Sequence, residues 1–178
     1  MSASLDDYSD PHLLDGLTGW ALDGVRALRD EAQAAEGGLS YVRRVVQGRL
    51  DIVGAELQRR REGGDPGDLS GLIAQLPDLL ADPDRGPSAG ARSPRRLDLA
   101  EVPDDLAVEL DQIVDTDALA DLPGFDTEAL DKMAQRLVDF ERWISERRHV
   151  VQGVVDTLQA EIARRYRDGE ATVDGLLD

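Results

Sequence analysis

The chain has 178 residues, no cysteine and a formal net charge of −17. Without cysteine it forms no disulfide or thiolate site, and no apolar run approaches the roughly 18 residues of a membrane span. The N-terminus, MSASLDDYSDPHLLD, lacks the cationic region and apolar core of a secretory signal, so we expect a cytoplasmic protein. Apolar residues make up 41% and aromatic residues 4%, which indicates a helical protein with an aliphatic core.

The first predicted helix runs from about residue 18 to residue 62. Its helical pattern ends at the Gly-Gly-Asp-Pro sequence of residues 63–66, a strong break. Within the helix, residues 36–51 (EGGLSYVRRVVQGRLD) have the pattern E-x3-S-x2-R-x3-Q-x3-D. These spacings keep the five polar side chains in one stripe about 80° wide on a helix. The stripe predicts a site for an elongated polar ligand.

The middle of the chain, about residues 63–125, is predicted to hold short helices and a linker. Weaker helical patterns cover roughly residues 68–81 and 104–121. Between them, residues 82–97 (DPDRGPSAGARSPRRL) have the proline, glycine and serine content of a flexible linker. We therefore expect disorder at 82–97, within a single domain that spans residues 1–178.

The second long helix is predicted over about residues 126–168. Asp126 or Thr127 can cap its start, and Gly169 follows its end. Residues 141–156 (ERWISERRHVVQGVVD) repeat the polar pattern 105 positions after its first copy. Of the 29 residue pairs aligned at this offset from residue 36 onward, 13 are identical, which indicates an internal duplication of one helix.

Both long helices carry apolar residues three and four apart, the spacing of heptad a and d positions. One arginine interrupts each series, Arg49 in the first helix and Arg147 in the second. Each helix needs the other to bury its stripe, so we predict a two-stranded coiled coil. The two series are Val25, Leu28, Ala32, Ala35, Leu39, Val42, Val46 and Val53, and Leu130, Met133, Leu137, Phe140, Ile144, Val151, Val154 and Leu158.

The polar stripes flank this seam. With Leu39 and Ile144 at a positions, the motif residues occupy positions e, b, e, b and f of both helices. Positions e face each other only in an antiparallel pair, so both stripes line one groove only if the helices run antiparallel. The predicted fold is all-α: a long antiparallel two-helix coiled coil, or helical hairpin, with additional short helices and a flexible linker.

The chemistry of the stripes favours a guanine-containing anion. Guanine O6 and N7 accept hydrogen bonds from arginine, and the protons on N1 and N2 bind a carboxylate. Gly48 and Gly153 each cost their helix about 1 kcal/mol, which is explained either by a ligand close to the backbone or by the duplication. The predicted register brings Arg43, Arg44, Arg148 and His149 to the centre of the groove and places Glu36 opposite Asp156, Ser40 opposite Gln152, Gln47 opposite Ser145 and Asp51 opposite Glu141.

The charge distribution supports an anionic ligand despite the acidic total. Residues 36–62 and 141–167 each contain six arginines and four acidic residues. The remaining 124 residues hold 8 basic and 29 acidic side chains, so the motif helices are basic islands in an acidic protein. The acidic remainder suits a basic protein partner, although solubility alone explains it equally well.

The doubled motif resembles the signature of RsiG, a family of actinobacterial anti-sigma factors that depend on cyclic di-GMP. Five fixed residues at four fixed spacings, matched twice, make the resemblance specific. It implies that arginines address guanine or phosphate and that carboxylates address guanine edges, on an intercalated dimer of cyclic di-GMP. The implied ligand residues are Glu36, Ser40, Arg43, Gln47, Asp51, Glu141, Ser145, Arg148, Gln152 and Asp156.

The resemblance also implies a partner. The nucleotide-loaded protein is expected to sequester a WhiG-type, flagellar-type sigma factor and so to repress sporulation genes. One chain is expected per sigma factor, without direct contact to nucleic acid or membrane.

Two rival functions are open to the same sequence. One is a structural coiled coil that binds proteins without nucleotide control. The other is an enzyme, for example a carboxylate-bridged metal oxidase built from Glu-x-x-His pairs in a bundle core. Neither His12 nor His149 is predicted to belong to such a pair, and the stripes offer no evident metal cluster or activated nucleophile. We therefore predict a regulator that is not an enzyme and holds no metal.

Overall fold

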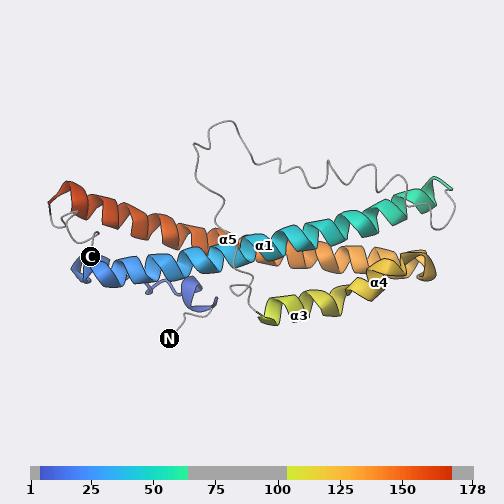
Figure 1. The fold of residues 1–178 in the computed structure, drawn as a ribbon, viewed down its shortest axis with the longest axis horizontal. Helices are drawn as coiled ribbons and strands as arrows, with labels where there is room; N and C mark the ends of the chain where they lie inside the picture. The colour runs from blue at the N-terminus through green and yellow to red at the C-terminus, as the bar shows by residue number, and fades with distance from the viewer. Residues whose placement is uncertain (1–4, 64–103, 170–178) are drawn as a thin grey trace. The chain divides into compact units, whose positions relative to one another are not determined.

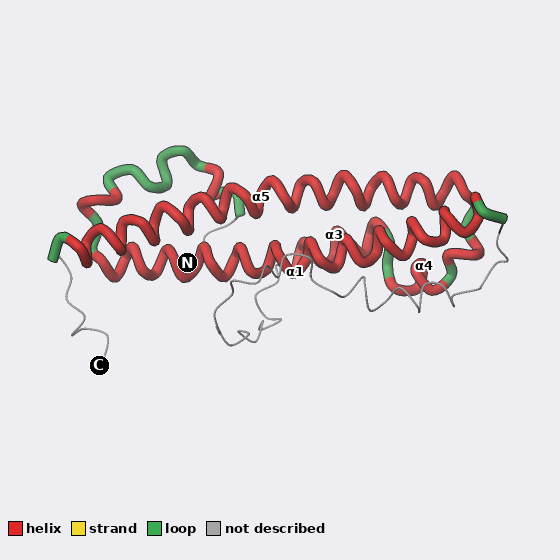
Figure 2. The backbone as a smooth tube through the Cα atoms, turned by 90° about the horizontal axis from the view of Figure 1, so that it is seen from above, coloured by secondary structure: helices red, strands yellow, loops and turns green. Residues whose placement is uncertain are grey.

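The computed structural model describes residues 5–63 and 104–169, and all regular structure in these ranges is helical. Figure 2 shows only helices and loops over this part of the chain. Two long helices dominate, α1 (Leu22–Arg61) and α5 (Thr127–Arg167). The prediction of an all-α fold is confirmed. None of the described helices is long and apolar enough to cross a membrane.

Shorter helices precede each long one. The predicted helix at 104–121 is present as two helices, because Asp115 breaks it and caps the second by accepting a hydrogen bond from the Ala118 amide at 2.7 Å. At α5 it is Asp126 that caps the helix, through the Ala129 amide at 2.7 Å. The predicted helix at 68–81 and linker at 82–97 lie outside the described residues. The short elements are η1 (Asp7–Ser9), η2 (Leu17–Gly19), α3 (Asp104–Ile113), α4 (Thr116–Ala120) and η4 (Leu122–Gly124).

The chain forms two compact units, and each contains one portion of both long helices. The first unit comprises Met1–Ser40 and Ser145–Asp178, and the second comprises Tyr41–Ile144. Within each unit, the α1 and α5 portions lie side by side in Figures 1 and 2. Both units are therefore helical pairs that share a continuous α1 and a continuous α5.

In the first unit, the two helix portions run antiparallel. Near the start of α1, Arg26 donates a hydrogen bond to the Tyr166 hydroxyl near the end of α5. Further along α1, Glu36 contacts Arg148, which lies earlier in α5. The preceding segment also packs here, since Tyr8 of η1 is buried. The predicted antiparallel direction is confirmed in this unit.

The second unit has the same direction. Gln47 of α1 donates a hydrogen bond to Glu141 of α5, and Arg60 near the end of α1 reaches Thr127 at the first turn of α5. Increasing residue numbers in α1 thus meet decreasing numbers in α5. Figure 1 shows α3 and α4 alongside these helix portions.

The predicted seam is the core of both units. Leu28, Ala35 and Met133 are half-buried members of the two series, and the others are buried. The interrupting arginines are not equivalent in the duplication, because the 105-residue offset aligns Arg49 with Val154 and Arg147 with Val42. The buried members are Val25, Ala32, Leu39, Val42, Val46, Val53, Leu130, Leu137, Phe140, Ile144, Val151, Val154 and Leu158.

Arg49 attaches α3 to the second unit. Its guanidinium donates hydrogen bonds to the carbonyl oxygens of Leu110 and Val114, and forms an ion pair with Asp111 at 2.8 Å. The last carbonyls of a helix lack partners within the helix and carry partial negative charge, which makes arginine a suitable cap. In the first unit, Arg147 forms an ion pair with Asp6 next to η1. Each seam arginine therefore anchors a short segment that precedes a long helix.

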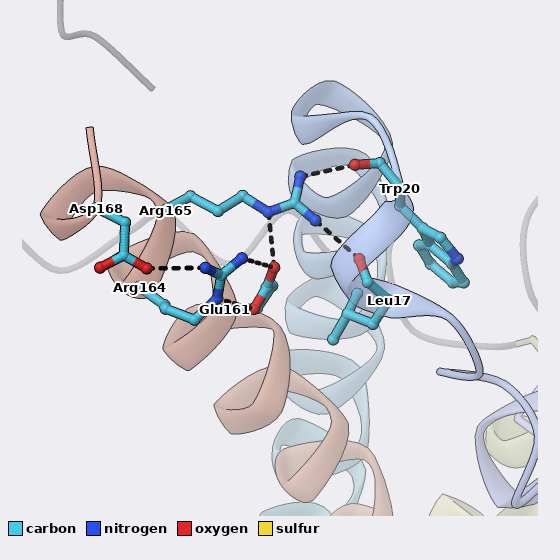
Figure 3. Close-up of polar contacts among 6 residues, drawn as sticks. All are labelled: Leu17, Trp20, Glu161, Arg164, Arg165 and Asp168. Carbon is cyan, nitrogen blue, oxygen red and sulfur yellow. Dashed lines mark hydrogen bonds and ion pairs between the residues drawn. The ribbon is translucent and has the colours of Figure 1, made fainter. Parts of the chain in front are cut away.

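A buried glutamate–arginine pair closes the seam of the first unit (Figure 3). Heptad numbering puts Glu161 at d and Arg165 at a, and only 8% and 5% of these residues is exposed. Arg165 donates to Glu161 at 2.7 Å and to the backbone carbonyls of Trp20 at 2.7 Å and Leu17 at 2.8 Å. Arg165 thus ties the end of α5 to the turn that leads into α1.

The second unit repeats this arrangement with the equivalent residues. Glu56 is buried at d, and Arg60 at a donates to it at 2.7 Å. The same arginine donates to the carbonyl of Leu122 at 2.9 Å, in the turn that leads into α5. We call the pairs Glu56–Arg60 and Glu161–Arg165, with the carbonyls they hold, the seam clamps.

The seam clamps predict acid sensitivity. Hydrogen bonds from Arg59 and Arg164 lower the pKa of Glu56 and Glu161, respectively, from the usual 4.5 to about 2. Because the folded pKa is depressed, this contribution to the free energy of unfolding is complete above pH 4.5 and is lost as pH falls toward 2. Urea unfolding across this range should show a steep loss of stability that is shallower in the Glu56→Gln/Glu161→Gln variant.

The control for this measurement is Glu128→Gln, which removes an exposed carboxylate that pairs with Lys132. Exposed ion pairs contribute little to stability, so this variant should follow the wild-type curve. Equal acid dependence of the double variant and the wild type would contradict the assignment.

Candidate functional site

All ten motif residues lie on the two long helices, since α1 covers residues 36–51 and α5 covers residues 141–156. The boundary between the two units divides both motifs. The first unit contains Glu36, Ser40, Ser145, Arg148, Gln152 and Asp156, and the second contains Arg43, Gln47, Asp51 and Glu141. Each unit therefore holds an arginine from one motif copy and a glutamate from the other.

In the first unit, Glu36 of α1 joins two other motif residues. Arg148 Nη1 of α5 lies 3.3 Å from Glu36 Oε1. Ser40, one turn along α1, donates its hydroxyl to the same oxygen at 2.8 Å. The side chains of Arg148 and Glu36 are 32% and 27% exposed, so the pair is accessible from solvent.

In the second unit, Glu141 of α5 has the corresponding role. Arg43 Nε of α1 lies 3.8 Å from Glu141 Oε1, and Gln47 donates to that oxygen at 3.2 Å. Arg43 and Glu141 are equivalent to Arg148 and Glu36 in the duplication. The two units thus present the same cross-helix ion pair with the helices exchanged.

One nitrogen of the first-unit pair lacks a protein partner. Arg148 Nε is buried and has no hydrogen-bond partner among the described residues. Buried donors in folded proteins are nearly always satisfied by protein or water. The Arg148–Glu36 pair therefore leaves one donor of Arg148 without a hydrogen-bond partner among the described residues.

The polar contacts correct the predicted pairing across the helices. Glu36 contacts Arg148, two turns before the predicted Asp156, and Gln47 contacts Glu141, one turn before the predicted Ser145. The physical reason is charge, because facing carboxylates repel whereas a carboxylate attracts a guanidinium. The predicted alignment put acids opposite acids, and the structure puts each glutamate beside an arginine.

The other motif residues are positioned differently. Gln152, Asp51 and Asp156 are exposed, and Ser145 is half-buried. Partial desolvation raises the pKa of the Asp51 carboxyl, although the residue as a whole is exposed. The chain therefore presents these oxygens and amides toward solvent, where a ligand can reach them.

The rival metal enzyme would need Glu-x-x-His pairs that project into a bundle core. Glu146 and His149 have the Glu-x-x-His spacing, but both are exposed rather than directed into the core. No group of three or more histidine, aspartate and glutamate residues in the described ranges is placed to hold a metal ion. Arg44, expected beside His149 at the centre of a groove, is exposed.

Sequence reasoning missed the seam clamps. Their signal was present, because Glu56, Arg59 and Arg60 are identical to their partners in the duplication. In a sequence, charged residues at d and a positions indicate that a coiled coil ends there. Their role becomes visible only when the backbone carbonyls that the arginine binds are known.

The glycines of the motif lie in open space. A Cβ atom built on Gly48 or Gly153 meets nothing within 4 Å. Their persistence in the duplication is therefore not explained by packing within the described chain.

This openness predicts opposite effects on folding and on ligand binding. Gly48→Ala and Gly153→Ala should each raise the free energy of unfolding by about 1 kcal/mol, because alanine restricts the unfolded backbone and favours helix. Thermal unfolding without ligand measures this gain. If a ligand approaches the backbone there, the same variants should bind it more weakly, and unchanged binding would leave the duplication as the explanation.

The comparison with known families covers most of the chain. The sequence model of the RsiG-like family matches residues 11–80 and 116–178. These ranges include both polar motifs and both seam clamps. No curated protein matches the chain significantly.

Proposed function

Because the chain belongs to the RsiG-like family of anti-sigma factors, we propose that it binds cyclic di-GMP and, when loaded, sequesters a sigma factor. Membership in this family implies a sigma factor as the protein partner. The nucleotide, the WhiG type of that sigma factor and the repression of sporulation genes are parts of the proposal. We further propose that the protein acts in the cytoplasm, as a regulator and not as an enzyme.

The observation that carries the nucleotide proposal is the cross-helix arginine–glutamate pair present in both units. Arg148–Glu36 and Arg43–Glu141 combine a donor fork with a carboxylate, the two groups that address guanine O6 and N7 and guanine N1 and N2. Because the arginine–glutamate pair occurs in both units, it suits a ligand with two equivalent guanines. The buried, unpartnered Nε of Arg148 adds a donor for guanine or phosphate oxygen.

The energies favour exchange of these pairs for ligand contacts. Partly exposed ion pairs contribute about 0–1 kcal/mol each, because water screens them. Hydrogen bonds between a charged group and a ligand contribute roughly 1.5–3 kcal/mol. The arginines can therefore leave their glutamates for a ligand without unfolding the helices, whose stability lies in the buried seam.

The resemblance to RsiG extends the proposal to the remaining motif residues. Ser40, Ser145, Gln47 and Gln152 supply neutral donors and acceptors beside the arginines, and the exposed aspartates supply further acceptors. We propose that all ten bind an intercalated dimer of cyclic di-GMP. One chain then serves one sigma factor, with no direct contact to nucleic acid.

Nucleotide and sigma factor must be coupled for this control to work. If bound nucleotide raises the affinity for sigma, sigma must raise the affinity for nucleotide by the same factor. Sequestered sigma is unavailable to RNA polymerase, which represses its genes. The rival function, a structural coiled coil, predicts no such coupling and no effect of nucleotide on stability.

The proposed site should distinguish guanine from adenine. The protein, alone or with its sigma factor, should bind cyclic di-GMP in preference to cyclic di-AMP. Adenine carries an amino donor where guanine carries O6, so it mismatches the arginine donors. Calorimetric titration at two salt concentrations measures the preference, and affinity should fall with salt because exposed charges are screened. Equal affinity for the two dinucleotides would refute the guanine assignment.

Substitution of the motif arginines should separate binding from folding. Arg43→Ala and Arg148→Ala should each lower nucleotide affinity about ten- to a hundredfold, through loss of roughly 1.5–3 kcal/mol of charge-assisted hydrogen bonding. Thermal stability without nucleotide should change little, since both side chains lie outside the seam. In a pull-down, the double variant should lose the nucleotide-stimulated capture of sigma.

The matched control is Arg44→Ala/Arg142→Ala, which removes two exposed arginines next to the motif positions in the same helices. It changes the net charge equally, so any difference from the motif variant is specific to position. Full nucleotide-stimulated capture by the motif variant would show that these arginines are not the regulatory site.

A further inference from the structure

The aliphatic seam by itself specifies its alignment poorly. Apart from the interrupting Arg49 and Arg147, its a and d positions are filled by apolar side chains, most of them aliphatic, in both helices. Sliding one helix by a heptad, about 10 Å at 1.5 Å per residue, again places apolar residues against apolar residues. The helix ends would lose contacts, as would Arg49 with α3 and Arg147 with Asp6.

The motif tolerates no such slip. Glu36 and Arg148 are 3.3 Å apart in the first unit, and Arg43 and Glu141 are 3.8 Å apart in the second. A displacement of one heptad would separate both pairs by more than the length of an arginine side chain. Something other than the seam must therefore select the native alignment.

The seam clamps have the geometry to do so. Arg165 is buried and holds the carbonyls of Leu17 and Trp20, in the turn joined directly to the start of α1. In any slipped alignment Arg165 would lose these carbonyls, and a slip toward the interior of α1 would also place Glu161 and Arg165 against aliphatic side chains. Burying charged groups without hydrogen-bond partners is strongly unfavourable, so slipped alignments are disfavoured.

The second unit has the same device in the opposite sense. Arg60 at the end of α1 holds the Leu122 carbonyl in the turn before α5, and Glu56 beside it is buried. In each unit, an arginine in the last turns of one helix thus binds the backbone just before the first turn of the other, so its hydrogen bonds form in only one axial alignment. A single buried polar residue in a coiled coil is known to specify alignment at some cost in stability.

We propose that the two seam clamps are positioning elements that set the axial register of α5 against α1 in each unit and so align the motif arginines with their glutamates. The register itself is independent of any ligand. Its consequence for cyclic di-GMP rests on the proposed function.

The test replaces both clamps with seam residues, Glu56→Met, Arg60→Leu, Glu161→Met and Arg165→Leu. Apolar residues of similar size can substitute for buried ion pairs without loss of folding, so this clamp variant extends the seam. The control variant, Arg61→Ala/Arg167→Ala, removes exposed arginines from the same final turns. A further variant with only the Glu161 and Arg165 replacements covers the case in which the full variant fails to fold.

Register is measured between spin labels on engineered cysteines, which the cysteine-free chain accepts without background. One label pair lies in each unit, at exposed positions: Ala27 with Ala163 in the first, and Gln58 with Gln135 in the second. The wild type and the control should give one distance per pair. The clamp variant should add a population displaced by a helical slip of about 10 Å.

Nucleotide titration supplies the second readout. If only aligned chains bind, the apparent affinity of the clamp variant falls by the aligned fraction, about tenfold where one chain in ten remains aligned. Single, unshifted distances in folded clamp variants would overturn the proposal. If the clamp variant shows slipped distances but the wild type binds no cyclic di-GMP, the proposal that the clamps set the register stands and the proposed nucleotide function is rejected.

Discussion

Burial of an aliphatic seam between α1 and α5 is the interaction on which both units depend. Seam residues such as Leu39, Ile144 and Leu158 are fully buried, and most of the buried apolar residues of both long helices belong to this seam. Each buried side chain of this size contributes roughly 1.5–3 kcal/mol. The long helices are therefore stable as a pair, and the short segments attach to them through Arg49, Arg147 and the seam clamps.

This arrangement separates stability from recognition. The seam uses positions a and d, whereas the polar motif uses e, b and f, so the motif side chains remain partly exposed on rigid helices. If the motif binds the proposed nucleotide, this scaffold holds arginine and glutamate on fixed helices before the ligand arrives. Weak ion pairs between them keep the charges compensated in the free protein and can be exchanged at low cost.

The duplication explains why the two units have equivalent polar contacts. The same residues form the cross-helix pair and the seam clamp in each unit, with the roles of the two helices exchanged. This repeated arrangement is the basis for proposing a ligand with two equivalent halves, whose binding is coupled to that of sigma. The differences between the units, such as α3 on Arg49, are where the chain departs from this symmetry.

The sequence by itself determined the helices, their seam, their antiparallel direction and the motif, because heptad spacing and repeated polar residues are local patterns. It misplaced the partners of Glu36 and Gln47, since alignment between helices depends on ion pairs and turns that are distant in sequence. It also did not predict the hydrogen bonds from Arg165 to the Leu17 carbonyl and from Arg60 to the Leu122 carbonyl. Backbone carbonyls are present at every residue and leave no signal in the sequence. Only the tertiary structure decides which carbonyl meets which guanidinium, and therefore which register the aliphatic seam adopts.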